Sequence, residues 1–208
     1  MSITANERAE LCDLFQEVGP DAPTLCEGWS TRDLLAHMLV RERRPDAAIA
    51  IVVPFFREHA ADVTKGIAAE PWETMIKTFR EGPPLWSPWA IPVLGDKANL
   101  AEFFVHHEDV RRGEPGWASR GADETRDGAV WNTITRMGRL LYRRSPVGLV
   151  LRRPTGEQAV IKTGSGLVTI EGEPGEILLH AFGRDAARVE LRGQPADVAA
   201  LENAARGV

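Results

Sequence analysis

Apolar side chains recur every three or four residues through the first two thirds of the chain, the spacing of amphipathic helices. The pattern predicts helices over residues 6–18, from Ser30 to about Ala60 with a kink or a break at Pro45, from Pro71 to Arg80, from Asp96 or Asn99 to Arg112, and over 124–142. Ser30 and Asp33 form a capping signal at the start of the second helix. Residues 85–92 hold two Trp and two Pro, which indicate an irregular apolar loop.

Beyond residue 145 the pattern changes to short runs rich in β-branched residues, which predict strands at 147–151, 158–162 and 167–171. Pro154-Thr155-Gly156 separates the first two runs, and we expect Gly164-Ser165-Gly166 to form a hairpin turn between the next two. A helix at 175–182, a strand at 188–192 and a helix at 195–205 follow. The sequence therefore predicts a mainly α protein, with a helical domain over 1–145 and a small α+β domain over 146–208.

The composition narrows the possible functions of these 208 residues. Lys and Arg number 25 against 30 Asp and Glu, and this net charge of −5 argues against a surface for nucleic acid or anionic membrane. The apolar stretch at 47–56 is too short to span a bilayer, and the amino terminus lacks a signal-peptide pattern. Cys12 and Cys26 suit a reducing compartment, so we expect a cytoplasmic protein.

With two cysteines and five histidines, a metal site in this chain must use mainly imidazoles and carboxylates. Glu102, His106 and Asp109 fall on one stripe of the helix predicted over NLAEFFVHHEDVRRG, whose other positions are largely apolar. Glu102 and His106 stand at i and i+4, the spacing at which two side chains converge on one ion. His37, in the apolar segment LLAHML, is the natural third ligand of a Zn²⁺ site with an open position.

Other interpretations of these residues remain open. His37 also fits a hydrogen-bonded core histidine, and a Glu–His pair four residues apart is common on helix surfaces. Asp109 either orients a metal ligand, binds the metal itself, or pairs with an arginine such as Arg112. Cys26 is either a packed or a reactive thiol. We expect His107 to pack or hydrogen-bond away from the stripe, and His59 and His180 lie near charges or element ends. The pairs Arg143-Arg144 and Arg152-Arg153 are either solvated or face an anionic cosubstrate.

Two segments resemble a known family. LCEGWSTRDLLAHM is similar to the C-x-G-W-[ST]-x-x-D-[LV]-x-A-H-[LM] segment of the mycothiol-dependent maleylpyruvate isomerase amino-terminal domain, and EFFVHHEDVRRGEPGW is similar to its second motif. The resemblance implies a DinB/YfiT-like metal-binding four-helix bundle followed by a small α+β domain. It implies His37, Glu102 and His106 as the metal ligands. The EFFVHHEDVRR run and Ser87-Pro88-Trp89-Ala90 also resemble an uncharacterised DinB-like subgroup.

These observations lead to two main functional hypotheses. The first is a zinc-dependent thiol transferase or isomerase that uses a low-molecular-weight thiol such as mycothiol on a small electrophile, with Trp86 and Trp89 lining the pocket. The alternative is a non-catalytic metal- or ligand-binding protein or sensor, in which the metal site is structural or vestigial. A weaker third possibility is an apolar-ligand carrier built on the carboxy-terminal domain. We expect no nucleic-acid or membrane partner, and a monomer or homodimer.

Overall fold

The computed structural model describes residues 2–48, 57–90 and 92–207. The chain divides into two compact units, residues 1–119 and 120–208. The predicted continuation of a helix through residues 49–56 lies outside the described residues. Among the described residues, no helix combines the length and the apolar character that crossing a bilayer requires.

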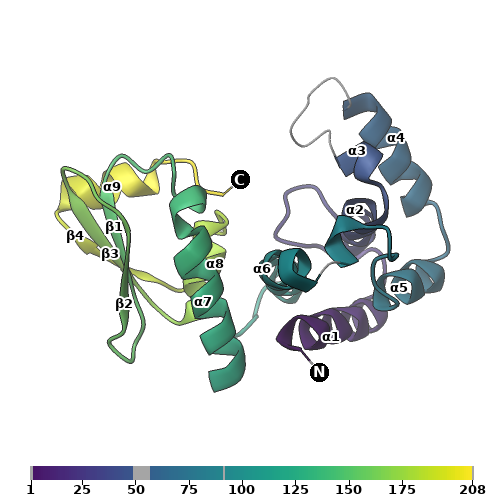
Figure 1. Ribbon diagram of the computed structural model, residues 1–208, viewed down its shortest axis with the longest axis horizontal. Helices are drawn as coiled ribbons and strands as arrows, with labels where there is room; N and C mark the ends of the chain where they lie inside the picture. The colour runs from purple at the N-terminus through teal and green to yellow at the C-terminus, as the bar shows by residue number, and fades with distance from the viewer. Residues whose placement is uncertain (1, 49–56, 91, 208) are drawn as a thin grey trace. The chain divides into compact units, whose positions relative to one another are not determined.

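The first unit is helical. Its elements are α1 (Ile3–Val18), α2 (Thr31–Arg43), α3 (Pro45–Ala48), α4 (Arg57–Ala68), α5 (Trp72–Arg80), the 3-10 turn η3 (Pro88–Ala90) and α6 (Pro92–Arg111). Helices α1, α2, α5 and α6 form a bundle, in which α1 packs against α5 and α6, and α2 packs against α5 (Figure 1). Their inward faces share one apolar core, built mainly by Leu11, Phe15, Leu34, Leu35, Met38, Leu39, Met75, Ile76, Phe79 and Phe103.

Several helix ends follow the sequence signals, and others differ from them by a few residues or more. Ser30 caps α2: the Asp33 amide donates to the Ser30 side chain, and the Asp33 carboxylate accepts from the Ser30 amide. Pro45 ends the continuous pattern as predicted, since α2 stops at Arg43 and α3 begins at Pro45. Pro71 is the residue before α5 rather than its first residue. The sixth helix begins at Pro92, earlier than predicted, because proline suits a first helical position.

The second unit is a small α+β fold. Its elements are α7 (Glu124–Leu141), β1 (Gly148–Arg152), β2 (Gln158–Lys162), β3 (Leu167–Glu171), α8 (Pro174–Ala181), β4 (Glu190–Gly193) and α9 (Pro195–Glu202). The sheet has the order β2-β1-β3-β4, with β1 and β3 parallel and the other pairs antiparallel. Helix α7 packs against α8 and β2, and α9 packs against β3 and β4 (Figure 1). The predicted fold class, a helical bundle followed by a small α+β region, is confirmed.

The expected hairpin at Gly164-Ser165-Gly166 is wrong. Strands β2 and β3 lie on opposite sides of β1, so the segment between them crosses the end of β1. The crossing is close: a Cβ at Gly164 would lie 2.5 Å from the Gly148 amide nitrogen, and the Gly148 amide donates to the Gly166 carbonyl at 2.8 Å. The glycines therefore mark a close backbone approach, which short strand patterns cannot distinguish from a turn.

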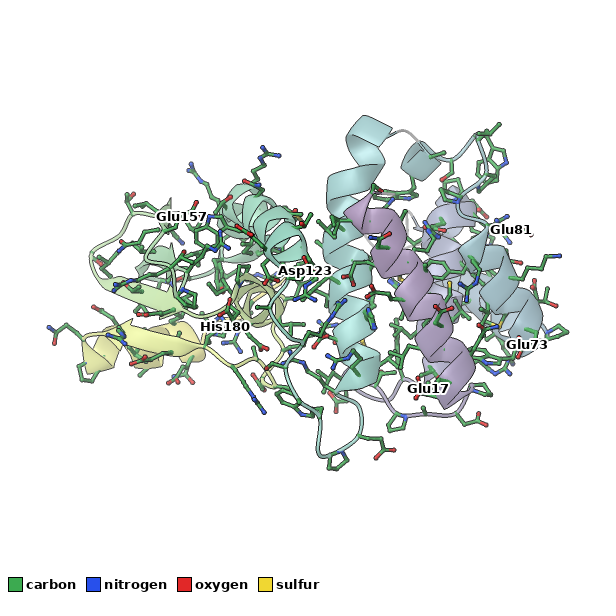
Figure 2. The ribbon with its side chains drawn as sticks, turned by 90° about the horizontal axis from the view of Figure 1, so that it is seen from below. Glu17, Glu73, Glu81, Asp123, Glu157 and His180 are labelled. Carbon is green, nitrogen blue, oxygen red and sulfur yellow. The ribbon has the colours of Figure 1, made fainter. Side chains whose placement is uncertain are left out.

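Helix α7 lies in the second compact unit, which begins at Arg120. The sequence pattern grouped this helix with the preceding ones, since its amphipathic spacing looks the same whether its apolar face packs on helices or on a sheet. Asp123 caps it by accepting from the amides of Thr125 and Arg126 (Figure 2). The prediction that residues 1–145 and 146–208 are separate domains, each able to fold alone, stays a prediction.

Candidate metal centre

The candidate centre is built on the facing sides of α2 and α6. The apolar stripe of α2 places Leu34, Leu35 and Met38 in the core, and His37 lies at the edge of that stripe. On α6, Phe103 and Val110 enter the same core. The polar side chains of α2 and α6 therefore meet at the rim of the bundle core.

The three predicted ligands come together there. His37 Nε2 lies 3.4 Å from Glu102 Oε1, and His106 Nε2 lies 3.3 Å from the same oxygen. One ligand atom from each residue lies within 4.8 Å of the other two. The side chains of His37, Glu102 and His106 are 27%, 22% and 10% exposed, which leaves the cluster accessible from one side.

A second layer of side chains orients His106. Its Nδ1 lies 2.9 Å from Oδ2 of Asp109, a carboxylate that is fully buried. The same oxygen accepts from the thiol of Cys26 at 3.3 Å. A carboxylate on Nδ1 favours a proton there, so Nε2 is the nitrogen that faces Glu102 and that could bind an ion after losing its own proton. The structure thus gives Asp109 the orienting position among the alternatives left open by the sequence.

The charges of the cluster follow from these contacts. Burial opposes the charge of the Glu102 carboxylate, but hydrogen bonds from His106 and His37 hold the pKa of Glu102 well below its ordinary value. Burial likewise opposes protonation of His106, but hydrogen bonds with Asp109 and Cys26 hold the pKa of His106 well above its ordinary value. The raised pKa of His106 thus reflects the acceptors around its imidazole, and the lowered pKa of Glu102 reflects the donors around its carboxylate.

The loop before α2 is fixed to the end of α6. The Leu25 amide donates to the Asp109 carbonyl at 3.0 Å, which places Cys26 beside the Asp109 carboxylate. Gly113 makes this approach possible, because a Cβ at this position would lie 2.0 Å from the Pro23 carbonyl oxygen. The loop, the end of α6 and the candidate ligands thus form one connected structure.

The other thiol and histidines lie outside this cluster. Cys12 is enclosed in the bundle core, and burial raises its pKa to about 11, which makes it an inert packing residue. His107 Nδ1 lies 3.2 Å from Glu7 Oε2, away from the stripe as predicted. The exposed His59 pairs with Asp46.

Arg41 is a residue of the site that sequence reasoning missed. Its Nε lies 3.8 Å from Glu102 Oε1, the oxygen that faces both histidines. Its position four residues after His37 was the available signal, because side chains at i and i+4 lie on one helix face. Of the two tryptophans expected to line a pocket, Trp89 packs on this guanidinium and Trp86 is 63% exposed.

The residues present fit a divalent metal ion of the zinc type. Two imidazole nitrogens and one carboxylate oxygen, on two facing helices, are a donor set that Zn²⁺ and related first-row ions prefer. A carboxylate behind one imidazole is the usual support of a ligating histidine. Two other groups in the described residues have ligand atoms equally close together: Cys26 with His106 and Asp109, and Glu7 with Glu10 and His107.

The chain was compared with known proteins and solved structures. No protein-family model and no curated protein sequence matches it. Two solved structures do: mycothiol-dependent maleylpyruvate isomerase, and a mutant of that enzyme in which one histidine is replaced by alanine. Each covers 90% of this chain and 90% of its own chain, with a TM-score of 0.59 and 15% sequence identity. The likeness supports the predicted fold, and membership of the finer subgroup stays a prediction.

Proposed function

We propose that this protein is a divalent-metal-dependent enzyme that joins a low-molecular-weight thiol to a small electrophile, as a thiol transferase or isomerase. The convergence of His37, Glu102 and His106 at an accessible rim carries the proposal. The structural likeness to a mycothiol-dependent maleylpyruvate isomerase supports it, since that enzyme has the same fold. Mycothiol is accordingly the proposed thiol, and zinc is the proposed metal.

His37, Glu102 and His106 would hold the ion, and an ion so bound supplies the charge that keeps a thiol ionised at neutral pH. Glu102 contributes a carboxylate that stays charged across the physiological range. Asp109 fixes the orientation of the His106 imidazole through Nδ1. Trp29 packs against the His37 ring, with the ring centroids 5.3 Å apart.

The proposal is tested by the metal content and the thiol chemistry of the purified protein. We expect about one zinc ion per chain by elemental analysis, and mycothiol-dependent conversion of maleylpyruvate or a related electrophile. A transferase would consume the thiol, whereas an isomerase would add it and then release it, so both the thiol and the electrophile are measured. His106→Ala should lose both the metal and the activity, because Nε2 supplies a ligand atom. His59→Ala is the matched control, since His59 pairs with Asp46 at the surface.

Each contrary outcome has a definite meaning. Full zinc occupancy in His106→Ala would contradict the assigned ligands. Zinc binding without turnover of any pair of thiol and electrophile would favour the alternative function, a non-catalytic metal-binding protein or sensor. A glutathione control shows whether the activity depends on mycothiol or on any small thiol.

A further inference from the structure

The second compact unit contains a cavity of about 470 Å³ between the end of α7 and strand β2. A volume of this size is typical of small-molecule sites, which measure about 300–1,000 Å³. Strand β2 is an edge strand of the described sheet and pairs with β1 alone, so the cavity lies at an edge of that sheet. The residues that line it are Arg139, Arg143, Val160, Ile161, Lys162 and Thr163.

Helix α7 and strand β2 are closely packed beside this cavity. Gly138 lies directly against Ile161, because a Cβ at Gly138 would be 3.0 Å from Ile161 Cγ2. Ile161 is 7% exposed, whereas the neighbouring Val160 is 69% exposed. The packing therefore fixes the wall of the cavity, and Val160 leaves apolar surface that the hydrocarbon part of a ligand can cover.

Two of the three cationic side chains are held by backbone carbonyls near the end of α7. Lys162 Nζ donates to the carbonyl of Arg143, at 3.1 Å, and to that of Ser145. Arg143 Nη1 donates to the carbonyls of Leu140 and Gly207, at 3.3 and 3.2 Å. These bonds restrict the rotation of both side chains, which lowers the entropy lost when a ligand binds. They also offset the partial negative charge of the helix end, which would otherwise repel an anion.

Hydrogen-bond donors remain for a ligand on the held cations. An ammonium group has three N–H donors, so Lys162 keeps one after donating to two carbonyls. A guanidinium has five, and the bonds of Arg143 to carbonyls use Nη1 alone. Carbonyls carry no net charge, so the positive charges of both groups persist. The cavity thus presents oriented cationic donors.

The lining of the cavity contains three cations and no carboxylate. Two other arginines of this unit differ in this respect, since Arg152 contacts Glu171 and Arg153 contacts Glu157. Like charges that line one cavity repel one another, and an anion placed between them replaces this repulsion with charge-assisted hydrogen bonds. The cavity is therefore suited to an anionic ligand.

We infer that this cavity binds the phosphate group of a small soluble molecule, held by Arg139, Arg143 and Lys162. Three cationic side chains match the three terminal oxygens and the nearly double negative charge of a phosphate monoester better than the two oxygens and single charge of a carboxylate. A cavity of limited volume and a net charge of −5 favour a soluble ligand over an anionic membrane surface. This binding function goes beyond the proposed one, because it requires no metal ion.

Calorimetry on the full chain tests the inference with phenyl phosphate, and phenyl sulfate is a probe of the same shape with one negative charge fewer. At pH 8, where a phosphate monoester is a dianion, phenyl phosphate should bind about tenfold more tightly than phenyl sulfate, or better. Arg139→Gln should weaken the binding of phenyl phosphate about threefold to tenfold, because an exposed charge-assisted contact is lost. The double variant Arg139→Gln/Arg143→Gln should weaken it by about tenfold or more.

The matched control is Arg192→Gln, which makes the same change in net charge within the same compact unit. Arg192 lies on β4, at the opposite edge of the sheet from β2. Its replacement should leave the affinity for phenyl phosphate within about twofold of wild type. Arg139 and Arg143 are exposed, so their variants should stay folded, and the comparison of the two probes on wild-type protein needs no variant.

The other outcomes overturn the inference. They are wild-type protein that binds neither probe or binds both equally, and binding that survives the double variant, which would place the phosphate elsewhere, such as on the metal. A loss in Arg192→Gln equal to that in the double variant would show an effect of net charge alone. Binding to vesicles of phosphatidylcholine and phosphatidic acid, with none to phenyl phosphate, would replace the soluble ligand with a lipid headgroup. Absence of zinc would overturn the proposed function and leave this inference intact.

Discussion

Each of the two compact units of this protein buries a histidine, and the partners of the two imidazoles carry opposite charges. His106 lies between the carboxylates of Glu102 and Asp109, which hold its pKa well above the ordinary value despite burial. His180 on α8, labelled in Figure 2, lies between the Tyr142 hydroxyl and the Arg206 guanidinium, each at 2.7 Å. Burial, reinforced by the charge of Arg206, lowers the pKa of His180 to about 3.

The comparison shows that burial alone does not decide what a histidine can do. Arg206 donates to Nε2 of His180, so the ring is neutral, carries its proton on Nδ1 and has no nitrogen left for a cation. His180 thereby links α8 to Tyr142, at the end of α7, and to the carboxy-terminal segment. In the helical unit, Asp109 occupies one nitrogen of His106, and the other faces an accessible cluster. The first arrangement stabilises a fold, whereas the second attracts a positive ion.

The largest expected effect is a loss of stability when His180, the neutral histidine, is replaced. His180→Ala should lower the free energy of unfolding by about 3 kcal/mol, because it leaves a cavity and deprives the buried Tyr142 hydroxyl of a partner. Zinc content should not change. The measurement is urea denaturation, with His59→Ala as an exposed control within about 0.5 kcal/mol of wild type. Loss of zinc from His180→Ala would break the contrast between the two histidines.

Replacing Asp109, whose carboxylate contacts His106, should affect metal binding rather than stability. Asp109→Asn should weaken zinc binding about tenfold to hundredfold, because the carboxylate that orients His106 is replaced by a neutral amide. Competition with a chromophoric chelator measures this change. Asp46→Asn is the control, since Asp46 contacts His59 at the surface. Equal zinc affinity in the two variants would show that Asp109 has no orienting role.

Acid should destabilise the folded state through His180. The folded-state pKa of about 3 is below the unfolded value of 6.5, so below pH 6.5 the unfolded chain binds a proton that the folded chain does not. The contribution of His180 to stability is therefore lost as the pH falls, by about 2 kcal/mol at pH 5. His106 has the opposite sign in metal-free protein: its contribution is complete below pH 6.5 and is lost as the pH rises through its raised pKa.

Denaturant titrations in the presence of a chelator, between pH 5 and pH 8, separate these two terms. His180→Asn should remove the decline in stability on the acid side, and His106→Asn should remove the decline on the alkaline side. The same acid decline in His180→Asn and in wild type would assign that decline to other groups.

The smallest expected effect is a change in zinc affinity when Cys26, whose thiol lies beside the cluster, is replaced. Cys26→Ser keeps a donor near Asp109, so zinc affinity should stay within about threefold of wild type. Because Cys26, His106 and Asp109 also form a group with closely spaced ligand atoms, the variant distinguishes two ligand sets. A loss of hundredfold or more would identify Cys26 as a ligand and would remove the orienting role of Asp109.

Much of the fold could be predicted from local signals. The spacing of apolar residues located α1, α2, α5, α7 and much of α6, and β-branched runs located β2 and β3 at the residues where the structure has them. The extent of α4 was not predicted, since the pattern indicated an end near Ala60 and the helix continues to Ala68. Strand order could not be predicted, because pairing across β1 depends on a close backbone crossing at Gly148 and Gly164 rather than on strand composition. The assignment of α7 to the second compact unit was missed for a similar reason, since its apolar face does not reveal its partner.

The candidate site was predictable where its residues share one element. Glu102, His106 and Asp109 follow a single helical stripe, so their convergence was visible in the sequence. The contact of Cys26 with Asp109 joins residues 83 positions apart and depends on how a loop folds back. Arg41 was missed because an arginine in the last turn of a helix normally indicates a solvated end, and only the tertiary structure shows it buried beneath Trp89.

The close approach at Gly113 has a consequence for how this protein can diverge. A side chain there would collide with backbone atoms of Pro23 and Thr24, so no substitution in the loop would make room for it and only a different loop path would. The loop that carries Cys26 and the helix that carries His106 cannot therefore vary in length independently. In related sequences we expect glycine at this position wherever the loop length is kept, and joint replacement of both segments wherever it is not. The covariation of these two segments would then identify relatives that keep the same arrangement, even at low overall identity.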